Sequence, residues 1–361
     1  MIRLLLVISL ILLTGNQADS APSVSGVSVG PTSISITGAD FGTRANTPAY
    51  YNDFDSETIG QIPSDQTTNI ASFGTVESNV YRGAKSLEFN WNTSDSESFQ
   101  RNVVDIGAGG SDKIFVSMWV YMDKTGTTAT DFQLKGVYAT SCSDYYSCYT
   151  AESSWVLFNH FWEDMPRWYN STAALVYGWD GSTMDSLSSA ANPSDAWLWG
   201  EWQRVDYYMQ RSSTGLAADG IMYWNRVGRS TPMVNQTTVP THYDGNSEWR
   251  YVSIVQGVAS IAGGTLDYDV YVDDVYMDTS RARVEICDVA TWANRTHCEI
   301  QPSVEWSDTG ITATLNSGSF AIGATAYAIV VDSFGAASNG EAVTIPGGPQ
   351  SRGTVPLGDM R

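Results

Sequence analysis

The feature that most constrains this chain is the period of its apolar residues, which alternate with polar ones in nearly every readable segment. The clearest segments are rich in Val, Ile, Tyr and Trp, and they span residues 113–122, 201–210, 249–256 and 266–277. Alternation at every second position is typical of a pleated strand, whereas an amphipathic helix needs a period of 3.6. Clusters of Gly, Ser, Asn and Asp separate the segments. We therefore predict an all-β fold of antiparallel sandwiches.

The character of the strands divides the chain into two parts. Both ends alternate with small residues, as in residues 23–42 and 310–345, whereas the middle is rich in Trp and Tyr. Neither end is long enough for a core of its own, but together they would form an immunoglobulin-like sandwich of about 90 residues. The predicted units are a split small sandwich (residues 21–47 and 284–346), a large sandwich (48–283) and a flexible tail (347–361).

The first residues predict the compartment. Arg3 precedes an apolar run from Leu4 to Leu13, and polar and small residues follow as far as Ser20. This order is typical of a secretory signal peptide over residues 1–20. The run is too short for a bilayer, which takes about 20 residues to cross. We expect a secreted protein without membrane insertion.

Charge excludes one class of partner. The chain has 19 Lys and Arg against 39 Asp and Glu, which gives a formal net charge of −20. A phosphate backbone needs a basic footprint, so nucleic-acid binding is not expected. A disordered acidic tail is excluded too, because aromatic residues make up 12% of the chain.

Four cysteines fit an oxidising compartment. Their spacing favours two local disulfides, Cys142 with Cys148 and Cys287 with Cys298, although four cysteines permit three connectivities. Neither pair has the spacing of a zinc site.

Short motifs at both ends resemble a known family. Residues 36–42 (Ile-Thr-Gly-Ala-Asp-Phe-Gly) resemble the opening of an IPT/TIG domain, and residues 307–315, 330–335 and 338–340 resemble its closing strands. The resemblance implies one TIG-like domain interrupted by an insert, which a fold tolerates when the two ends of the insert lie close together.

The middle of the chain resembles a concanavalin A-like jelly roll of the kind found in polysaccharide lyases and carbohydrate-binding modules. The motifs that carry the resemblance are residues 52–60, 200–208 with 219–225, and 271–276. The resemblance implies a large jelly-roll sandwich. It does not imply an activity, because this fold hosts enzymes and inert binders alike.

The same resemblance implies a calcium ion. Asp53, Asp55 and Glu57 lie on the expected first strand and Asp273 and Asp274 on the last, and in this family those strands are neighbours. Calcium takes six to eight oxygen ligands, so such a cluster suits a structural ion. The alternative is a solvated acidic edge that prevents pairing with another sheet.

An aromatic-rich stretch at residues 155–169 predicts a glycan-binding face, because flat rings stack on sugars while polar neighbours fix their orientation. Core packing is the alternative for each Trp, since strand alternation sends about half of them inward. The candidate substrate-binding residues are Gln100, Arg101, Trp155, Trp162, Arg167, Trp168, Trp199 and Arg204.

Lyase chemistry needs a base that removes the proton beside a uronate carboxylate and a group that neutralises that carboxylate. The candidates are His160, Tyr169, Tyr208 and Lys135. Arg204 and Tyr208 share the parity of one strand and so face the same side. The chain lacks the Arg-Ser/Thr-Glu-Leu-Arg and Gln-Ile/Val-His blocks of alginate lyases, so no catalytic pair is carried over from them.

Three functions follow in order of preference. The first is binding of an extracellular polysaccharide through an aromatic jelly-roll face. The second is a polysaccharide lyase that acts by β-elimination, although the net charge of −20 would repel a uronate polymer from most of the surface. The third is a structural or adhesion subunit that associates with copies of itself.

Overall fold

The structure is a computed structural model. It describes residues 20–66, 74–93, 97–100, 102–107, 110–123, 131–140, 155–163, 173–179, 184–191, 198–214, 217–229, 231–239, 241, 248–255, 257–262 and 266–347. These residues form strands β1 to β25 and one short 3-10 helix, η1 (Trp292–Asn294). The prediction of an all-β antiparallel sandwich is confirmed.

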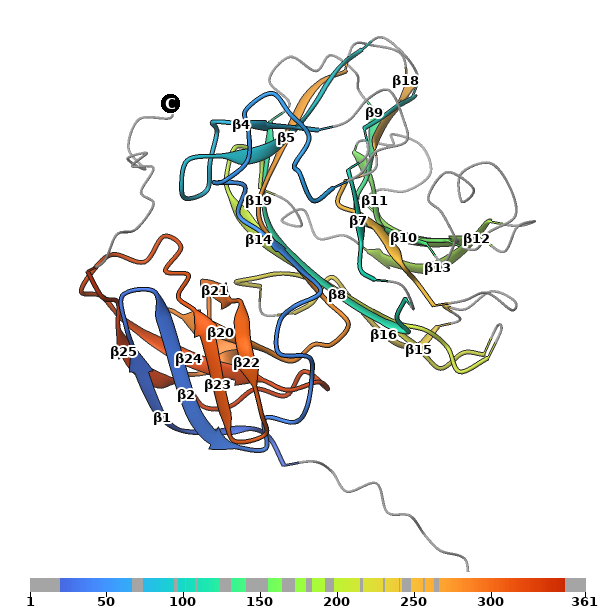
Figure 1. The fold of residues 1–361 in the computed structure, drawn as a ribbon. Helices are drawn as coiled ribbons and strands as arrows, with labels where there is room; N and C mark the ends of the chain where they lie inside the picture. Colours follow the sequence, from blue (N-terminus) through green and yellow to red (C-terminus); the bar gives the residue numbers. More distant parts are fainter. Residues whose placement is uncertain are drawn as a thin grey trace, which may run out of the picture.

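Two large sheets, built from the middle of the chain, form what we call the large sandwich (Figure 1). The eight-stranded sheet has the order β16 (Val234–Val239), β15 (Gly220–Arg226), β14 (Gln203–Gln210), β8 (Lys113–Asp123), β19 (Leu266–Asp278), β5 (Ser86–Thr93), β4 (Thr75–Glu77), and β3 (Tyr50–Asn52) also pairs with β19. The nine-stranded sheet has the order β6 (Glu97–Phe99), β18 (Gly257–Ala262), β9 (Asp131–Lys135), β11 (Trp155–Glu163), β10 (Tyr138–Thr140), β17 (Tyr251–Ser253), β7 (Val103–Asp105), and β12 (Ala173–Trp179) and β13 (Met184–Ala191) extend it beside β11.

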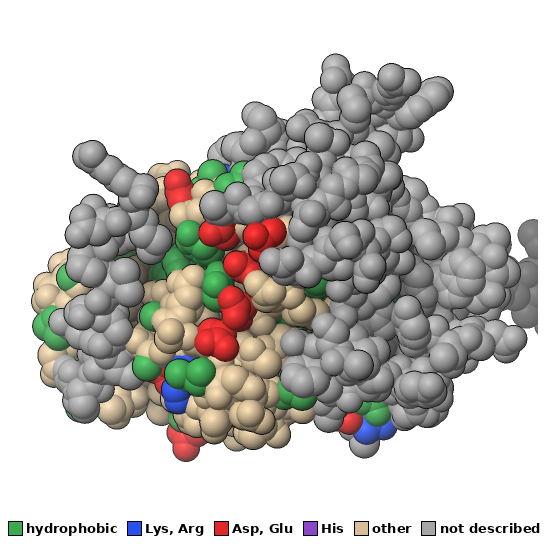
Figure 2. Space-filling model, turned by 90° about the horizontal axis from the view of Figure 1, so that it is seen from above, with side chains coloured by type: hydrophobic (Ala, Val, Ile, Leu, Met, Phe, Trp, Pro, Cys, Tyr) green, Lys and Arg blue, Asp and Glu red, His purple; other side chains and the backbone are tan. Residues whose placement is uncertain are grey.

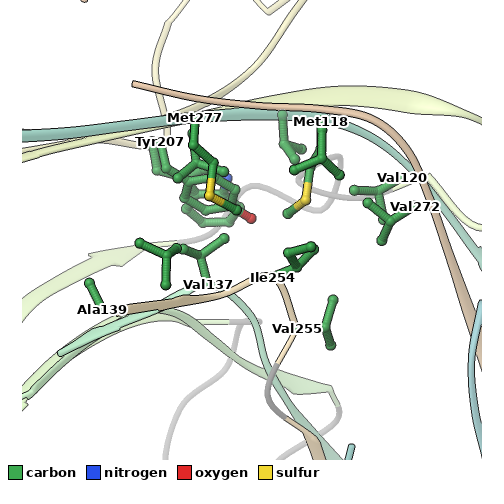
Figure 3. Packing of buried hydrophobic residues seen from close by; sticks show 14 of the residues in the cluster. Met118, Val120, Val137, Ala139, Tyr207, Ile254, Val255, Val272 and Met277 are labelled. Carbon is green, nitrogen blue, oxygen red and sulfur yellow. The ribbon is translucent and has the colours of Figure 1, made fainter. Parts of the chain in front are cut away.

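Strand alternation builds the core between these two sheets. In β8 the residues at even positions, such as Met118 and Val120, lie in the main buried cluster, whereas Phe115 at an odd position belongs to a cluster on the opposite face. Figure 3 shows Met118 and Val120 from one sheet facing Val137 and Ala139 from the other. The two-residue period that predicts the strands therefore also determines which alternate residues of each strand face the core.

Two four-stranded sheets form what we call the small sandwich. Their orders are β1 (Ser23–Val29), β2 (Ser33–Ala39), β23 (Gly310–Thr314), β22 (Ser303–Trp306), and β21 (Cys298–Gln301), β20 (Arg283–Cys287), β24 (Thr325–Val331), β25 (Glu341–Thr344). They enclose a separate cluster that includes Ile36, Val284 and Val330. Strands from both ends of the sequence lie side by side there, with Ile36 directly opposite Ile311 (Figure 1). The assignment of this part to the TIG family stays a prediction.

The disulfide between Cys287 and Cys298 is present and joins β20 to β21, as predicted. Cys142, Cys148, residues 1–19 and residues 348–361 lie outside the described residues. Within the described part of the chain, no helix is long and apolar enough to cross a membrane.

Candidate functional site

The face of the nine-stranded sheet that is turned away from the core is the first candidate site. Val137 and Ala139 point into the core, so Tyr138 between them belongs to the other face, where it packs with Val103 and Tyr251. We call this the outer face of the nine-stranded sheet. Tyr138 and Val103 are themselves buried there.

Strand register brings several predicted residues to this outer face. Tyr138 lies opposite Leu157 of β11, and further along the same strand His160 lies directly opposite Lys135 of β9. Between Leu157 and His160, two residues of β11 oppose one of β12, and because of this bulge both positions share a face. Trp155 and Trp162 occupy positions on that face as well.

The register has a chemical meaning. Residues directly opposite in an antiparallel pair have their Cβ atoms about 4.5–5.5 Å apart. The register therefore sets a residue type that can act as a base directly opposite a residue type that can neutralise a carboxylate. Trp155 lies five residues before His160 on the same strand and Trp162 two residues after it. Aromatic residues can stack on sugar units.

A second aromatic surface lies on the eight-stranded sheet, and we call it the acidic–aromatic face. Tyr121 contacts both Trp202 and Tyr271, with ring centroids 5.7 and 6.0 Å apart. Trp199, a predicted substrate-binding residue, is 36% exposed and packs edge-on against Tyr268. Seen from above, the described surface carries a row of acidic side chains beside hydrophobic ones (Figure 2).

Gln100, another predicted substrate-binding residue, follows β6 of the nine-stranded sheet and binds the main chain of β5. Its side chain accepts a hydrogen bond from the main-chain N–H of Asn90 at 3.2 Å and donates one to the Asn90 carbonyl. The polar atoms of Gln100 are therefore engaged in holding the main chain of β5.

Carboxylates crowd the acidic–aromatic face. Asp269 lies directly opposite Asp123, and Glu88 lies opposite Tyr271. Partial burial, together with repulsion from Asp267 and Asp123, raises the pKa of the Asp269 carboxyl. Partial burial, with repulsion from Asp269 and Glu77, likewise raises the pKa of Glu88. Such a face would repel a polyanionic ligand.

Arg204 and Tyr208 do face the same side of β14, as their parity predicts, but that part of the sheet is covered by the small sandwich. Arg204 is 2% exposed, and its guanidinium binds both carboxylate oxygens of Glu285 at 2.9 Å. Tyr208 is 2% exposed in a cluster with Phe115 and with Ile300 of β21. Neither side chain lies on a surface that a polymer could reach. The prediction of Arg204 as a substrate-binding residue and of Tyr208 as a catalytic residue is therefore corrected.

β3 and β19 are neighbours, as the resemblance implied, and Asp273 and Asp274 lie on β19, whereas Asp53, Asp55 and Glu57 lie in the loop that follows β3 and not on the strand itself. Most of the carboxylate oxygens of these residues accept hydrogen bonds from N–H groups, although Asp55 Oδ2 is buried without a partner among the described residues. Arg82 binds Asp274 and Asp53, while Asp273 accepts from the main-chain N–H groups of Tyr81 and Arg82. The side chain of Glu57 accepts from Ser64 and Asn52. The residues present do not fit a calcium cage.

A polar cleft of about 500 Å³ opens where β8 begins and β14 ends. Its lining includes Lys113, Arg211 and three carboxylates, those of Asp112, Asp219 and Glu248. Arg211 is bound to Asp112 at 2.9 Å. None of the residues that the sequence singled out lines this cleft.

Four predicted site residues, Arg101, Arg167, Trp168 and Tyr169, lie outside the described residues. The sequence analysis missed Arg82, Tyr121 and Tyr271. The two tyrosines could have been found from the outward parity of their strands. Arg82 carries no sequence signal, because it is a single arginine in a loop far from its acidic partners.

No family model matches the chain, and no curated protein sequence matches it either. Among solved structures, an endo-β-1,4-glucuronan lyase from the fungus Trichoderma reesei is similar, with 12% identity and a TM-score of 0.39 over 65% of this chain and 96% of that one. The alginate lyase Aly36B has 11% identity and a TM-score of 0.42 over 64% and 97%. The Emp46p carbohydrate recognition domain, in a potassium-bound form, has 8% identity and a TM-score of 0.39 over 64% and 97%. Likeness at this level carries no argument about activity.

Proposed function

We propose that this chain is a secreted protein that engages an extracellular polysaccharide through the outer face of the nine-stranded sheet. One observation carries the proposal: the register of β9 and β11 places Lys135, His160, Trp155 and Trp162 on the same face. Aromatic and polar positions in that combination suit a chain of sugars. The Cys287–Cys298 disulfide supports an oxidising, extracytoplasmic location.

The same register favours a lyase as the second candidate function. His160 would take the proton next to the uronate carboxylate while Lys135 offsets the charge of that carboxylate. The electron pair left behind would form a carbon–carbon double bond as the glycosidic C–O bond breaks. The leaving oxygen would take a proton from water, and the new unsaturated sugar would absorb ultraviolet light.

The charges of the two candidate faces point to different ligands. A uronate polymer would be repelled from the acidic–aromatic face, where Glu88 and Asp269 crowd together. It would meet a cation at Lys135 on the outer face of the nine-stranded sheet. Polymer charge therefore discriminates between the faces.

The test uses the mature chain with a panel of uronate and neutral polysaccharides, and it records both retention and the absorbance of unsaturated products. Retention that falls at least tenfold in Trp162→Ala, with Tyr271→Ala as the matched control on the other face, is the expected result. Rising absorbance that His160→Ala reduces by about 10²–10⁴-fold would identify a lyase. If no polymer is retained and no absorbance rises, both candidate functions are rejected and the structural-subunit prediction remains.

A further inference from the structure

Arg82 lies between the first and last strands of the large sandwich, where the resemblance implied a calcium ion. Its guanidinium makes two parallel hydrogen bonds to Asp274, from Nε to Oδ2 and from Nη2 to Oδ1, both 2.6 Å long. The same Nη2 reaches Asp53 Oδ2 at 3.2 Å and the Tyr51 hydroxyl at 2.8 Å. A planar guanidinium fits carboxylates in this two-pronged way, which a single point charge cannot do.

The remaining carboxylates of the cluster are held by main-chain N–H groups. Asp273 is fully buried, and its Oδ2 accepts from the N–H groups of Tyr81 and Arg82, both at 3.2 Å. Asp55 Oδ1 accepts from the N–H groups of Ala84 at 2.6 Å and Lys85 at 3.2 Å. These donors belong to one loop, residues 78–85, so the carboxylates bind this loop in place of a shared ion.

The carboxylate oxygens of the predicted ligands are not arranged around one point, as calcium coordination requires. A calcium ion needs six to eight oxygens that converge on one point. Among the described residues, the one group of three possible ligand residues with mutually close ligand atoms is Glu285, Cys287 and Cys298, and its two cysteines form a disulfide. None of the five predicted calcium ligands belongs to that group.

The loop that carries Arg82 is shaped for this contact. Gly83 has a φ of +70°, and a Cβ atom there would lie 2.3 Å from both carboxylate oxygens of Asp55. A side chain at this position would therefore push the loop away from Asp55. The sequence places glycine where this loop packs against Asp55 in the turn that follows β3.

The same loop reaches the small sandwich. Tyr81 stacks on Trp119 with centroids 3.8 Å apart and donates a hydrogen bond to Glu299 of β21 at 2.5 Å. Asn316, which follows β23, donates to Asp274 at 3.4 Å. One loop thus joins the first strand, the last strand and the neighbouring sandwich.

We propose that Arg82 is a built-in cation that takes the place of a calcium ion at this junction. The guanidinium neutralises Asp53 and Asp274 and binds β3 to β19, so the contact does not depend on the calcium concentration. An ion that binds the folded state must raise the melting midpoint in proportion to its occupancy, and here no such rise is expected. The inference is independent of the proposed polysaccharide binding, because its readout is stability.

Thermal melting of the mature chain tests the proposal, with chelator or with millimolar calcium. The wild-type midpoint is expected to be the same in both. Arg82→Ala leaves buried carboxylates without their partner, so its midpoint should fall by about 5–15 °C in chelator. Calcium should restore part of that loss, because the carboxylates freed by the substitution can then bind the ion.

Arg250→Ala is the matched control. It removes another arginine–carboxylate pair, with Asp105 at 2.6 Å, in which the two side chains are 31% and 37% exposed. Exposed ion pairs contribute little to stability. The melting midpoint of this variant should therefore lie within about 2 °C of the wild type and should not change when calcium is added.

Three results would overturn the proposal. One is a wild-type midpoint that rises with calcium and loses that response in Asp53→Ala. Another is an Arg82→Ala melting midpoint that stays within about 2 °C of the wild type. The third is an Arg82→Ala melting midpoint that falls in chelator and does not recover when calcium is added. If Arg82→Ala does not fold in chelator, folding on addition of calcium supports the proposal and failure to fold in calcium counts against it. Arg82→Lys keeps the charge without the planar fork and should melt between the other two proteins.

Discussion

Glu285 receives three ion-pair contacts in a place that water does not reach. Both of its oxygens bind Arg204, and Oε1 also accepts from Nε of Arg283 at 2.5 Å. Burial alone would raise the pKa of this carboxyl, but the charges of Arg204 and Arg283 hold its pKa well below the usual range. A carboxyl with a lowered pKa stabilises the folded state above its unfolded pKa, and the contribution is lost as the pH falls through the folded value.

Replacing Glu285 with Ala should therefore lower the free energy of unfolding by about 3–5 kcal/mol, because two buried arginines lose the carboxylate that they share and keep Asp206 as an acidic partner. Urea denaturation at neutral pH measures the loss. The control is Glu305→Ala on β22, where the carboxylate is exposed and the change should stay below about 0.5 kcal/mol. Equal losses in the two variants would contradict the assigned role of the buried pair.

Glu88 is expected to behave in the opposite way. Its raised pKa means that its contribution to stability is present below the ordinary pKa of a glutamate and is lost as the pH rises through the folded value. Glu88→Gln should therefore raise the free energy of unfolding at pH 7 by about 0.5 kcal/mol, a small gain because the side chain is partly exposed. The difference between the two proteins should vanish below about pH 4. Denaturant titration at both pH values provides the measurement.

At the scale of elements, the sequence predicts strands well because alternation is a local property. The segments expected at residues 113–122 and 266–277 match β8 and β19 to within one residue. The same parity placed Arg204 and Tyr208 on one face of β14, which is correct. What covers that face was not predictable, because the covering strands β20 and β21 lie about 80 residues further along the chain. The partners of Arg82 are equally remote, with Asp274 lying 192 residues away.

The disulfide links two neighbouring strands. Cys287 and Cys298 lie directly opposite each other on β20 and β21 and close a loop with a sequence separation of 11. Replacing both with Ala should lower the free energy of unfolding by about 3 kcal/mol, since the unfolded chain regains the entropy of that loop. Comparing the double variant with the wild type under reducing conditions gives the control, because the two should then agree to within about 1 kcal/mol.

At the scale of the whole molecule, the net charge of −20 acts on every polyanion that approaches. Raising the salt concentration from about 0.05 to 0.5 M shortens the screening length and should strengthen retention of a uronate polymer. Retention of a neutral glycan should stay constant. Affinity chromatography on both polymers measures the two responses, and uronate retention that weakens with salt would show that a local basic site outweighs the overall repulsion.

The two connections between the sandwiches have a mechanical consequence. The chain enters the large sandwich at β3 and leaves it at β19, and Tyr50 lies directly opposite Met277 on these neighbouring strands. β1 and β25, which stand closest to the two ends of the chain, both belong to the small sandwich. Tension applied along the chain is therefore carried by the hydrogen bonds of the small sandwich, such as those between β2 and β23. The large sandwich bears no force while the small sandwich is intact. We therefore expect the large sandwich to remain folded until the small sandwich has unfolded.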